Sequence, residues 1–382
     1  MDEESEPIII DIGSGTLKAG FASDDAPKCI IPMIIGKPKA PGILVGMDQK
    51  DCYVGHEARA KKNLLIMEEP VQNGVIINFE SIQKIFEHLF NNELRVSPEE
   101  HKIMITEPPN NPKKNREAIV DMMFQEFKVP KLYLGNQSVL SLFATGRTTG
   151  TVVDAGDGIT HTVPIYEGYA IPHAIQEIPL SGRDLTEFLY KILNQKVPHL
   201  IGDSTNDLEV VKHIKETMCI VAQDFDAEMK AASEQQTIER KYMLPGEKPL
   251  YLKEERLRCP EVLFQPGQAL KELNKDIEGI HKYTFDSIMK CDNDIKKDLF
   301  KNIVLAGGCT MFEGMKERMK KEIQALAPSP MGPEVDAPAD RKYSCWLGGA
   351  ILSLIEKFDP MWISRKDYDD NGGASIVHRK CF

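Results

Sequence analysis

The sequence has no run of about 18 consecutive apolar residues, the length that a membrane-spanning helix requires. It also has no basic stretch followed by an apolar one at its start, where residues 1–6 read MDEESE and are mostly acidic. Secretory leaders have the opposite pattern. We therefore expect an intracellular protein that does not act at a membrane.

Closely spaced cysteines are also missing. The eight cysteines are scattered over the whole chain, and none forms a CxxC-like pair. A zinc site favours such pairs because the short spacing lets two thiolates share one tetrahedral ion. We expect reduced thiols that act as small hydrophobic side chains.

Four common motifs are absent as well: the GxxxxGK[ST] P-loop, the GxGxxG dinucleotide fingerprint, HExxH and GxSxG. Their absence sets aside the P-loop and Rossmann nucleotide folds. It also removes the simplest zinc protease and serine hydrolase interpretations.

Basic residues are fewer than acidic ones. The chain has 47 Lys and Arg against 58 Asp and Glu, which gives a net charge of −11. This balance argues against a surface that binds a nucleic-acid backbone directly. The composition is that of a globular protein, with 42% hydrophobic and 27% charged residues. At roughly 100–200 residues per domain, 382 residues predict two to three domains.

Alternating strand and helix patterns predict an α/β protein. Residues 30–55 are short extended pieces broken by proline and glycine, which indicates a small loop-rich subdomain. Asn111 is expected to be the N-cap, and Pro112 to lie in the first turn, of a helix that contains residues 119–127. Strands are expected at 7–12, 103–106, 132–134, 151–153, 161–166 and 303–305. The other helices are expected at 82–90, 182–194, 207–231, 313–326 and 345–358.

Two similar segments indicate an internal repeat. Residues 9–15 (IIDIGSG) and 152–158 (VVDAGDG) each have a β-rich run, an Asp, one further residue and Gly-x-Gly. The glycines let backbone N–H groups approach an anion, and an Asp at each strand end can hold a divalent cation through water. The prediction is two related lobes, each with one phosphate-binding hairpin, although a single such segment is more often an ordinary turn.

A third glycine turn follows a strand-like run at 302–306. Gly307 and Gly308 would let a flat ligand lie against the backbone. The alternative is a strand-to-helix turn that is too crowded for side chains.

Longer motifs resemble the actin family along essentially the whole chain. They are DIGSGTLKAG at 11–20, VGMDQKDCYVG at 45–55, NELRV at 92–96, GRTTG at 146–150, HTVPIYEGY at 161–169, SIMKCD at 287–292 and SIVHRKCF at 375–382. The chain is similar to a divergent actin or a close actin-like protein.

The resemblance implies a two-lobed actin-like ATPase fold, in which two RNase H-like cores with smaller inserted subdomains surround a nucleotide cleft. It places subdomain 1 at 1–32, 70–144 and 344–382, and subdomain 2 at 33–69. It places subdomain 3 at 145–180 and 275–343, and subdomain 4 at 181–274.

The resemblance also implies ATP or ADP as the nucleotide, with Mg²⁺ or Ca²⁺. The phosphates would be held by two loops, which contain Gly13, Ser14, Gly15 and Lys18 in one and Gly156, Asp157 and Gly158 in the other. The residues expected around the adenosine are Lys215, Glu216, Gly307, Gly308, Met311 and Lys342. Asp11, Gln137 and Asp154 would order the water around the metal, and Gln137 and His161 would position the attacking water. All four of these residues are candidate catalytic residues, because phosphoryl transfer needs mainly positioning and charge neutralisation.

Filament contacts are implied too. The loop at 40–50 would insert into a neighbouring subunit, and the receiving groove would use Phe143, Tyr169, Ile351, Leu352 and Ile355. Ile351 to Ile355 could equally be plain helix core. Expected partners are other actin or actin-like subunits and actin-binding proteins, with myosin as one candidate that meets the acidic start of the chain.

The sequence departs from the family pattern at several points. Asn73 replaces a histidine that is methylated in most actins. The segment 267–275 (GQALKELNK) is longer and more charged than the apolar plug that family members bury between filament strands. Burying an unpaired Lys271 or Glu272 is costly, so this contact must differ or be absent.

Three functional hypotheses follow. The first is an ATPase that hydrolyses ATP slowly and assembles into cytoskeletal filaments in the cytoplasm. The second is an actin-like structural subunit of a larger ciliary or chromatin-associated complex, which does not polymerise freely. The third, a small-molecule kinase or chaperone ATPase of the same fold, is disfavoured by the actin-type tail and the lack of a peptide-binding domain.

Overall fold

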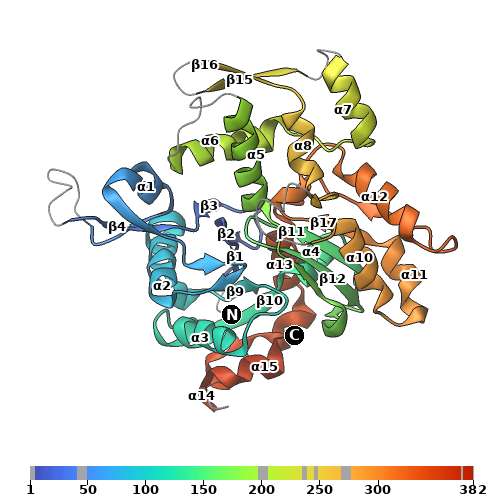
Figure 1. Cartoon of the computed structure of the whole chain (residues 1–382). Helices are drawn as coiled ribbons and strands as arrows, with labels where there is room; N and C mark the ends of the chain where they lie inside the picture. The colour runs from blue at the N-terminus through green and yellow to red at the C-terminus, as the bar shows by residue number, and fades with distance from the viewer. Residues whose placement is uncertain are drawn as a thin grey trace. The chain divides into compact units, whose positions relative to one another are not determined.

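The computed structural model describes residues 5–40, 50–196, 205–234, 239–244, 248–267, 277–370 and 373–381. The chain divides into two compact units. Unit 1 comprises Met1–Thr148 and Tyr343–Phe382, and unit 2 comprises Thr149–Lys342. Each unit contains one large mixed sheet with helices packed against it (Figure 1). The predicted α/β fold class is therefore confirmed, while the division into four subdomains stays a prediction.

The large sheet of unit 1 has the strand order β19-β10-β9-β1-β2-β3. Its central strand β1 pairs antiparallel with β2 and parallel with β9. The strands are β1 (Ile8–Ile12), β2 (Thr16–Phe21), β3 (Cys29–Pro32), β9 (Ile103–Glu107), β10 (Lys131–Asn136) and β19 (Ile363–Ser364).

Seven α-helices and two small sheets belong to the described part of unit 1. The helices are α1 (Gly55–Ala60), α2 (Phe79–His88), α3 (Lys113–Gln125), α4 (Gln137–Phe143), α13 (Ser344–Ser353), α14 (Arg365–Asp370) and α15 (Val377–Lys380). One small sheet joins β4 (Ile35–Pro38), β5 (Tyr53–Val54) and β6 (Leu65–Glu68), and the other joins β7 (Val71–Gln72) and β8 (Val75–Ile76). The described residues within 30–55 form mainly short strands, as predicted, while their grouping into a subdomain stays a prediction.

The large sheet of unit 2 has the order β13-β12-β11-β17-β18, and β14 also pairs with β12. Here β11 pairs antiparallel with β12 and parallel with β17. The strands are β11 (Gly150–Ala155), β12 (Thr160–Tyr166), β13 (Tyr169–Ala170), β14 (Gln176–Ile178), β17 (Ile303–Ala306) and β18 (Val335–Asp336).

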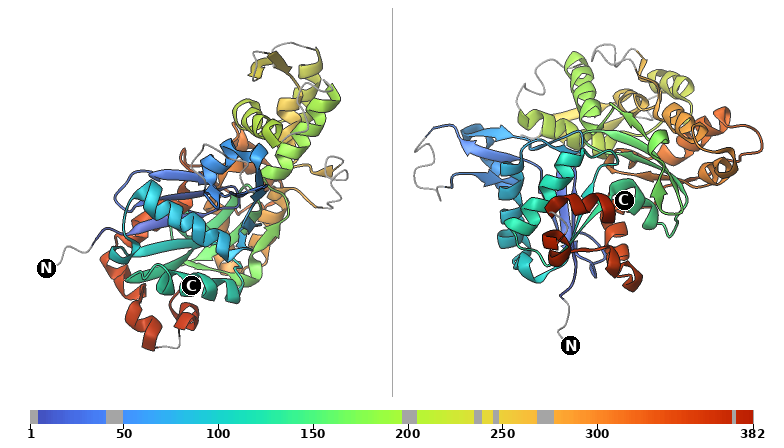
Figure 2. Two further views of the ribbon diagram at one scale, coloured as in Figure 1. Left: turned by 90° about the vertical axis from the view of Figure 1, so that its left-hand side faces the viewer. Right: turned by 90° about the horizontal axis from the view of Figure 1, so that it is seen from below.

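The helices of unit 2 form two groups. Helices α10 (Ile280–Met289) and α11 (Asn293–Lys301) contact β11 and β12, and α12 (Met315–Leu326) packs on α10. The second group consists of helices α5 to α8 together with the ribbon of β15 (Arg240–Leu244) and β16 (Lys248–Leu252), coloured green to yellow in Figure 2. The bounds of these helices are α5 Gly182–Lys196, α6 Thr205–Met218, α7 Phe225–Glu234 and α8 Glu255–Glu261.

Strand β1 is central to the core of unit 1. All of its residues are buried, because the strand has neighbours in the sheet on both edges and packs against α13. The indole nitrogen of Trp346 on α13 donates a hydrogen bond to the carbonyl oxygen of Ile9, at 3.1 Å. The C-terminal part of the chain therefore completes the core around the N-terminal strand.

The single helix predicted at 207–231 is wrong, because α6 ends at Met218 and α7 begins at Phe225. Between them the backbone N–H of Ile220 donates to the carbonyl oxygen of Arg256 (3.1 Å), and that of Val221 donates to the carbonyl oxygen of Glu313 (2.9 Å). These long-range hydrogen bonds replace the helical ones, so tertiary structure overrides a continuous helical pattern.

Two helix ends also differ from the sequence predictions. Helix α13 stops at Ser353 instead of continuing to 358, and a separate 3-10 helix runs over Glu356–Met361. Asn111 does not cap α3, because Pro112 occupies the N-cap position and the Asn111 amide instead donates to Glu107 Oε2, at 3.0 Å.

A reciprocal cap holds the start of α14. Ser364 Oγ accepts a hydrogen bond from the backbone N–H of Asp367 (3.1 Å), and Asp367 Oδ2 accepts one from the N–H of Ser364 (2.9 Å). Lys380 of α15 forms an ion pair with the same carboxylate at 2.9 Å. These hydrogen bonds lower the pKa of Asp367 to about 2.

Replacing Asp367 with asparagine is expected to lower the free energy of unfolding by about 1 kcal/mol at pH 7, a value discounted because the carboxylate is partly exposed to solvent. Since the pKa in the folded chain lies below the ordinary value of 3.8, this stabilisation is present above about pH 4 and disappears as the pH falls toward 2. Urea unfolding of both proteins across this range tests it. Asp370→Asn, which removes an exposed charge on the same helix, is the control. A deficit that persists unchanged at the lowest pH would contradict the assignment.

None of the helices in the described part of the chain has the length and apolar character that a bilayer-spanning segment needs. None of the eight cysteines, which all lie in the described ranges, forms a disulfide.

Candidate functional site

The two glycine hairpins predicted from the sequence have the same local geometry. In unit 1, β1 and β2 place Asp11 opposite Lys18, and the N–H of Gly13 donates to the carbonyl oxygen of Thr16 at 3.1 Å. In unit 2, β11 and β12 place Asp154 opposite His161, and the N–H of Gly156 donates to the carbonyl oxygen of Ile159 at 3.0 Å. Each pair of equivalent positions is 143 residues apart (154 − 11 and 161 − 18).

The equivalence continues into the neighbouring strands. The first strand of each hairpin pairs in parallel with a later strand, with Ile9 opposite Met104 in unit 1 and Val152 opposite Val304 in unit 2. The next strand outward, β10 or β18, is also parallel. The repeat in the sequence therefore corresponds to a repeated sheet topology, one copy in each unit.

Asp11 is the carboxylate of the unit 1 hairpin, and it is buried. Lys18 Nζ lies 2.7 Å from its Oδ2, and Thr106 Oγ1 donates to its Oδ1 at 2.8 Å. Burial by itself raises the pKa of Asp11, but the charge and hydrogen bond of Lys18 and the hydroxyl of Thr106 outweigh it, so the pKa lies below its ordinary value. Asp11 is therefore ionised and fixed in position.

Gln137 contacts the same cluster from the first turn of α4. Its Nε2 donates to the carbonyl oxygen of Ile12 (2.9 Å) and to Thr106 Oγ1 (3.2 Å), and it lies 3.4 Å from Asp11 Oδ1. Asn136 fixes the start of this helix, because its side-chain oxygen accepts hydrogen bonds from the backbone N–H groups of residues 138 and 139. The side-chain amide nitrogen of Gln137 therefore donates its hydrogen bonds to atoms of the protein itself.

The rest of the unit 1 loop is tied to a neighbouring turn. Ser14 Oγ accepts a hydrogen bond from the N–H of Gly74 at 2.8 Å, and the carbonyl oxygen of Gly15 accepts one from the N–H of Met33 at 3.1 Å. Asn73, next to Gly74, has a φ of +50°. Asparagine tolerates this left-handed conformation better than most residues. The candidate phosphate loop is therefore coupled to the β7–β8 hairpin through one hydroxyl.

In unit 2, Asp157 carries two cationic partners. Lys212 Nζ lies 3.1 Å from Oδ1, and an Arg183 nitrogen lies 3.2 Å from Oδ2. Burial raises the pKa of Asp157, yet Lys212 and Arg183 together hold it below its ordinary value. The pKa of Lys212 is raised in turn, because Asp157 outweighs the effect of burial.

Lys215 lies one helical turn beyond Lys212 on α6 and is buried. Its Nζ donates to the carbonyl oxygen of Gly182 (2.8 Å) and to Thr186 Oγ1 (3.0 Å). The carbonyl oxygen of Gly156 accepts hydrogen bonds from the N–H of Gly182 (2.9 Å) and from Cys309 Sγ (3.2 Å). The start of α5 therefore joins the hairpin loop to α6.

Gly307 and Gly308 differ in how much space surrounds them. Gly307 has a φ of +83°, and a Cβ at this position would overlap the carbonyl oxygen of Ala155 and lie 2.5 Å from Asp154 Oδ1. A Cβ on Gly308 would meet no described atom within 4 Å. The first glycine is required by crowding at the end of β17, and the second leaves its backbone open to a ligand.

His161 is buried in the middle of three strands. It faces Asp154 on β11 and Glu177 on β14. Burial lowers the pKa of His161 to about 4, and the Glu177 carboxylate offsets only part of this effect. The imidazole is therefore neutral near pH 7.

The remaining predicted positions are less enclosed. Glu216 and Lys342 are exposed, and Met311 is half-buried with its N–H donating to the carbonyl oxygen of Gly308 at 3.2 Å. Gly13 and Gly158 are half-buried loop residues. All of these predicted site residues lie in the described ranges.

The structure therefore groups the predicted residues by unit. Unit 1 joins Asp11, Lys18 and Gln137 directly, with Ser14 in the same loop. Unit 2 joins the loop at 156–158 to Lys215 through Gly182.

Three side chains contribute to these clusters without being among the predicted site residues. These are Thr106, Arg183 and Lys212. Thr106 ends a predicted strand, Arg183 lies in the expected helix at 182–194, and Lys212 precedes Lys215 by three positions on one helix face, but only the folded chain brings Arg183 and Lys212 to Asp157.

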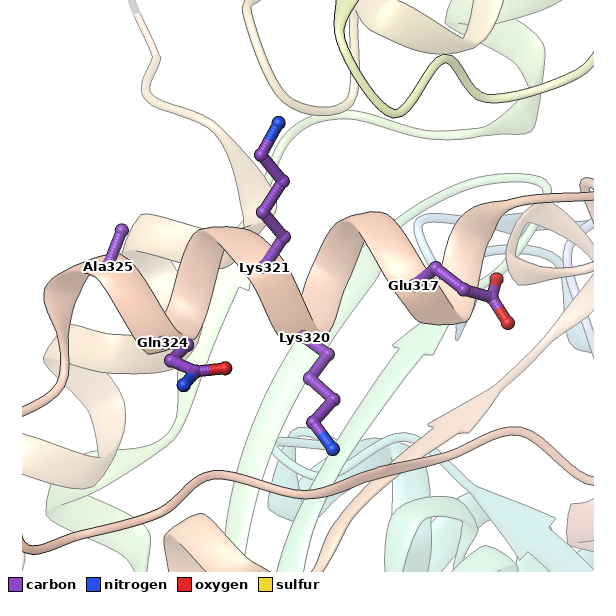
Figure 3. A pocket seen from close by; sticks show the side chains of 5 residues that line it. All are labelled: Glu317, Lys320, Lys321, Gln324 and Ala325. Carbon is purple, nitrogen blue, oxygen red and sulfur yellow. The ribbon is translucent and has the colours of Figure 1, made fainter.

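A surface hollow of about 520 Å³ lies along α12 and does not coincide with these residues (Figure 3). Its described lining comes from α12 alone, and the side chains of Lys320 and Lys321 point to different sides of the helix. Lys320 pairs with Glu334 at 2.7 Å, and Lys321 donates to the carbonyl oxygen of Gln223 at 2.6 Å. Among its described lining residues, no polar groups converge on a common point.

Taken separately, each hairpin has a chemistry that suits a phosphorylated ligand with a hard divalent cation. Lysine and arginine side chains and glycine N–H groups suit phosphate oxygens. The carboxylates of Asp11 and Asp154 suit such a cation. Because Asp11 is already paired with Lys18 at 2.7 Å, contact through a bound water fits this site better than direct coordination.

A comparison with protein-family models gives one further finding. The actin family model matches residues 2–382, which is nearly the whole chain. Proteins of this family generally bind and hydrolyse ATP, commonly with a divalent cation. Together with the two mixed sheets, this match shows that the chain belongs to the actin family.

Proposed function

We propose that this chain binds ATP with Mg²⁺ or Ca²⁺, hydrolyses it slowly and assembles into filaments. The observation that carries the proposal is the matched pair of hairpins, each with an Asp in register opposite a basic or imidazole side chain. Membership of the actin family supports ATP as the nucleotide. The geometry within each hairpin supports the assignment of individual residues to phosphate binding, cation binding and water positioning.

The phosphate contacts are assigned to the two loops. Lys18 and the N–H groups of Ser14 and Gly15 would bind phosphate oxygens in unit 1. In unit 2 the N–H groups of Asp157 and Gly158 would do the same, while Lys212 and Arg183 hold the Asp157 carboxylate in a fixed orientation. The cation would neutralise charge on the phosphates, and Asp11, Gln137 and Asp154 would hold it through water.

Orientation of the attacking water is assigned to Gln137 and His161. The Gln137 Nε2 is committed to the Ile12 carbonyl and to Thr106, so its Oε1 is the atom available to accept a hydrogen bond from water. His161 is neutral near pH 7, so one ring nitrogen can accept a hydrogen bond from water without carrying a charge. Both residues position water, which is the main requirement of phosphoryl transfer.

Assembly is supported by apolar groups at the surface of each unit. Ile351 and Ile355 are 48% and 46% exposed, which contradicts their interpretation as plain helix core, and Tyr169 in unit 2 is 61% exposed. The loop at 41–49 and the segment 268–276, which the filament hypothesis also invokes, lie outside the described residues. We place the assembled protein in the cytoskeleton, with other actin-like subunits and actin-binding proteins as partners.

The polar sequence at 267–275 favours the alternative of a subunit that is built into a larger complex without free polymerisation. Sedimentation of the purified chain in Mg²⁺, ATP and salt distinguishes the two. Pelleted filaments, seen also by electron microscopy, and slow release of phosphate are expected. A chain that hydrolyses ATP and stays in the supernatant at concentrations where conventional actin assembles would favour the alternative.

A further inference from the structure

We propose that Asn73 is a site of covalent modification, at which the side-chain amide is lost and an aspartate or isoaspartate forms. Asn73 and Gly74 are the two residues between β7 and β8. The reaction needs only water, and its rate depends on the hydroxyl of Ser14 in the loop of the unit 1 hairpin. The proposed function neither includes this reaction nor depends on it.

Asn73 and Gly74 form a tight two-residue turn. Their φ angles are +50° and +79°, the positive values that a type I′ turn requires, and Asn-Gly is a preferred pair for this turn. The ladder between β7 and β8 has only two pairs of residues. Turn geometry therefore explains why this dipeptide stands here, and it places a chemically labile asparagine at the tip of a very short hairpin.

The nucleophile of the reaction is the backbone nitrogen of Gly74. It attacks the side-chain carbonyl carbon of Asn73, so that an N–C bond forms and the amide group leaves as ammonia with the proton of that nitrogen. The product is a five-membered succinimide ring. Water then adds to one of the two ring carbonyls and opens the ring, to aspartate or to isoaspartate, and no electrons are transferred. Glycine favours the attack because it has no Cβ that would shield the nitrogen.

The side chain of Asn73 is accessible to this chemistry. It is exposed, and the described part of the chain offers it no hydrogen-bond partner. The strands below the turn are more firmly held, because Val71 and Ile76 are buried and the Asn115 amide donates to the carbonyl oxygen of Ile76 at 2.7 Å. The turn can therefore open locally while the strands stay in place.

Ser14 restrains the reacting nitrogen. Its Oγ accepts the hydrogen bond of the Gly74 N–H at 2.8 Å and so ties the turn to the loop at 13–15. The nitrogen can attack only after it has lost this proton and the backbone between Asn73 and Gly74 has rotated out of the turn conformation. Both changes break the hydrogen bond. The folded chain should therefore react more slowly than a peptide of the same sequence.

Either product adds one negative charge, because a carboxylate replaces a neutral amide. The new charge would lie next to the residue whose N–H holds Ser14. Isoaspartate also adds one carbon to the backbone, which a two-residue turn cannot accommodate without a shift. A lower affinity for a phosphorylated ligand follows only if Ser14 and Gly15 bind phosphate. That consequence rests on the proposed function, whereas the modification does not.

The test is incubation of the folded full-length chain at mildly alkaline pH, followed by proteolysis and peptide mass mapping. A synthetic peptide of residues 69–78 gives the rate without the fold. We expect a gain of about 1 Da on the fragment that contains Asn73, with isoaspartate labelled by an isoaspartyl methyltransferase. The other Asn-Gly pair of the sequence, Asn371 and Gly372, lies outside the described residues and provides an internal reference rate.

Ser14→Ala is expected to speed the reaction at Asn73 about fivefold, the factor that corresponds to about 1 kcal/mol for one hydrogen bond, and to leave the rate at Asn371 unchanged. Asn73→Gln keeps an amide but would have to close a six-membered ring, so no mass gain is expected there. No product at Asn73 in the folded chain, at a time when the peptide is fully converted, would overturn the proposal. Equal rates in the folded chain and the peptide would refute the restraint even if Ser14→Ala folds poorly.

Asn73→Asp tests the consequence for the ligand separately. Weaker binding of a fluorescent ATP analogue is expected, because the added charge repels phosphate. Unchanged binding would refute that consequence, while the mass mapping still decides whether Asn73 is modified.

Discussion

Replacing Gly348 with alanine is expected to lower the free energy of unfolding by about 3 kcal/mol, at the upper end of what overpacking costs. Gly348 lies where α13 crosses α4, and a Cβ there would overlap the carbonyl oxygen of Leu140. A backbone carbonyl in a helix cannot rotate away as a side chain can. The two helices must therefore separate, and the contacts of α13 with β1 and β9 change with them. Urea unfolding followed by circular dichroism measures the loss.

Two variants at the same crossing make this result interpretable. At Gly349 a Cβ would lie 2.9 Å from Ile9 Cγ2 and 3.2 Å from Met104 Sδ, which are side-chain atoms that can shift, so Gly349→Ala should cost less. Ser141→Ala on α4 removes a buried hydroxyl without a hydrogen-bond partner, and should change stability by less than about 0.5 kcal/mol. Equal effects of the two glycine substitutions would show that backbone overlap is not the cause.

Replacing Gln137 with alanine is expected to slow ATP hydrolysis by about 100-fold while nucleotide binding persists. The side chain is held by the Ile12 carbonyl and by Thr106, so its oxygen has a defined position from which to orient water. Alanine removes that oxygen and leaves the Lys18–Asp11 pair in place. Single-turnover phosphate release and the affinity for a fluorescent ATP analogue separate the two effects.

Gln83→Ala on α2 is the matched control, because that amide contacts Glu87 and takes no part in the proposed site. It should hydrolyse ATP at the rate of the unmodified chain. Unchanged hydrolysis in Gln137→Ala would remove this residue from its assigned role. Loss of nucleotide binding would instead assign Gln137 to the support of Asp11.

The hairpins could be predicted from sequence because their signal is local. A β-branched run, an Asp and two glycines within seven residues determine both the strand end and the turn, and the structure places all of them as expected. The pairing of Asp11 with Lys18 also follows once the turn length is known, since register fixes which residues face each other.

Contacts that depend on distant parts of the chain could not be predicted in this way. The break after Met218 is caused by hydrogen bonds to Arg256 and Glu313, which are far away in sequence. The partners of Asp157 come from α5 and α6, so the amino-acid pattern near Asp157 contains no information about them. Sequence reasoning therefore identified the loops that carry the candidate site and missed the side chains that neutralise one of its carboxylates.

The hydrogen bond from Trp346 to Ile9 has a consequence for synthesis of the chain on the ribosome. The two residues are 337 positions apart, and α13 and β19 also come from the last part of the sequence. While translation proceeds, the sheet of unit 1 has one face without α13 and one edge strand, β10, without β19. Unit 2 is continuous in sequence, so all of its residues are synthesised before Trp346 is added. The nascent chain therefore passes through a stage in which its second unit can be complete while its first still presents apolar surface and unpaired strand backbone to the surroundings.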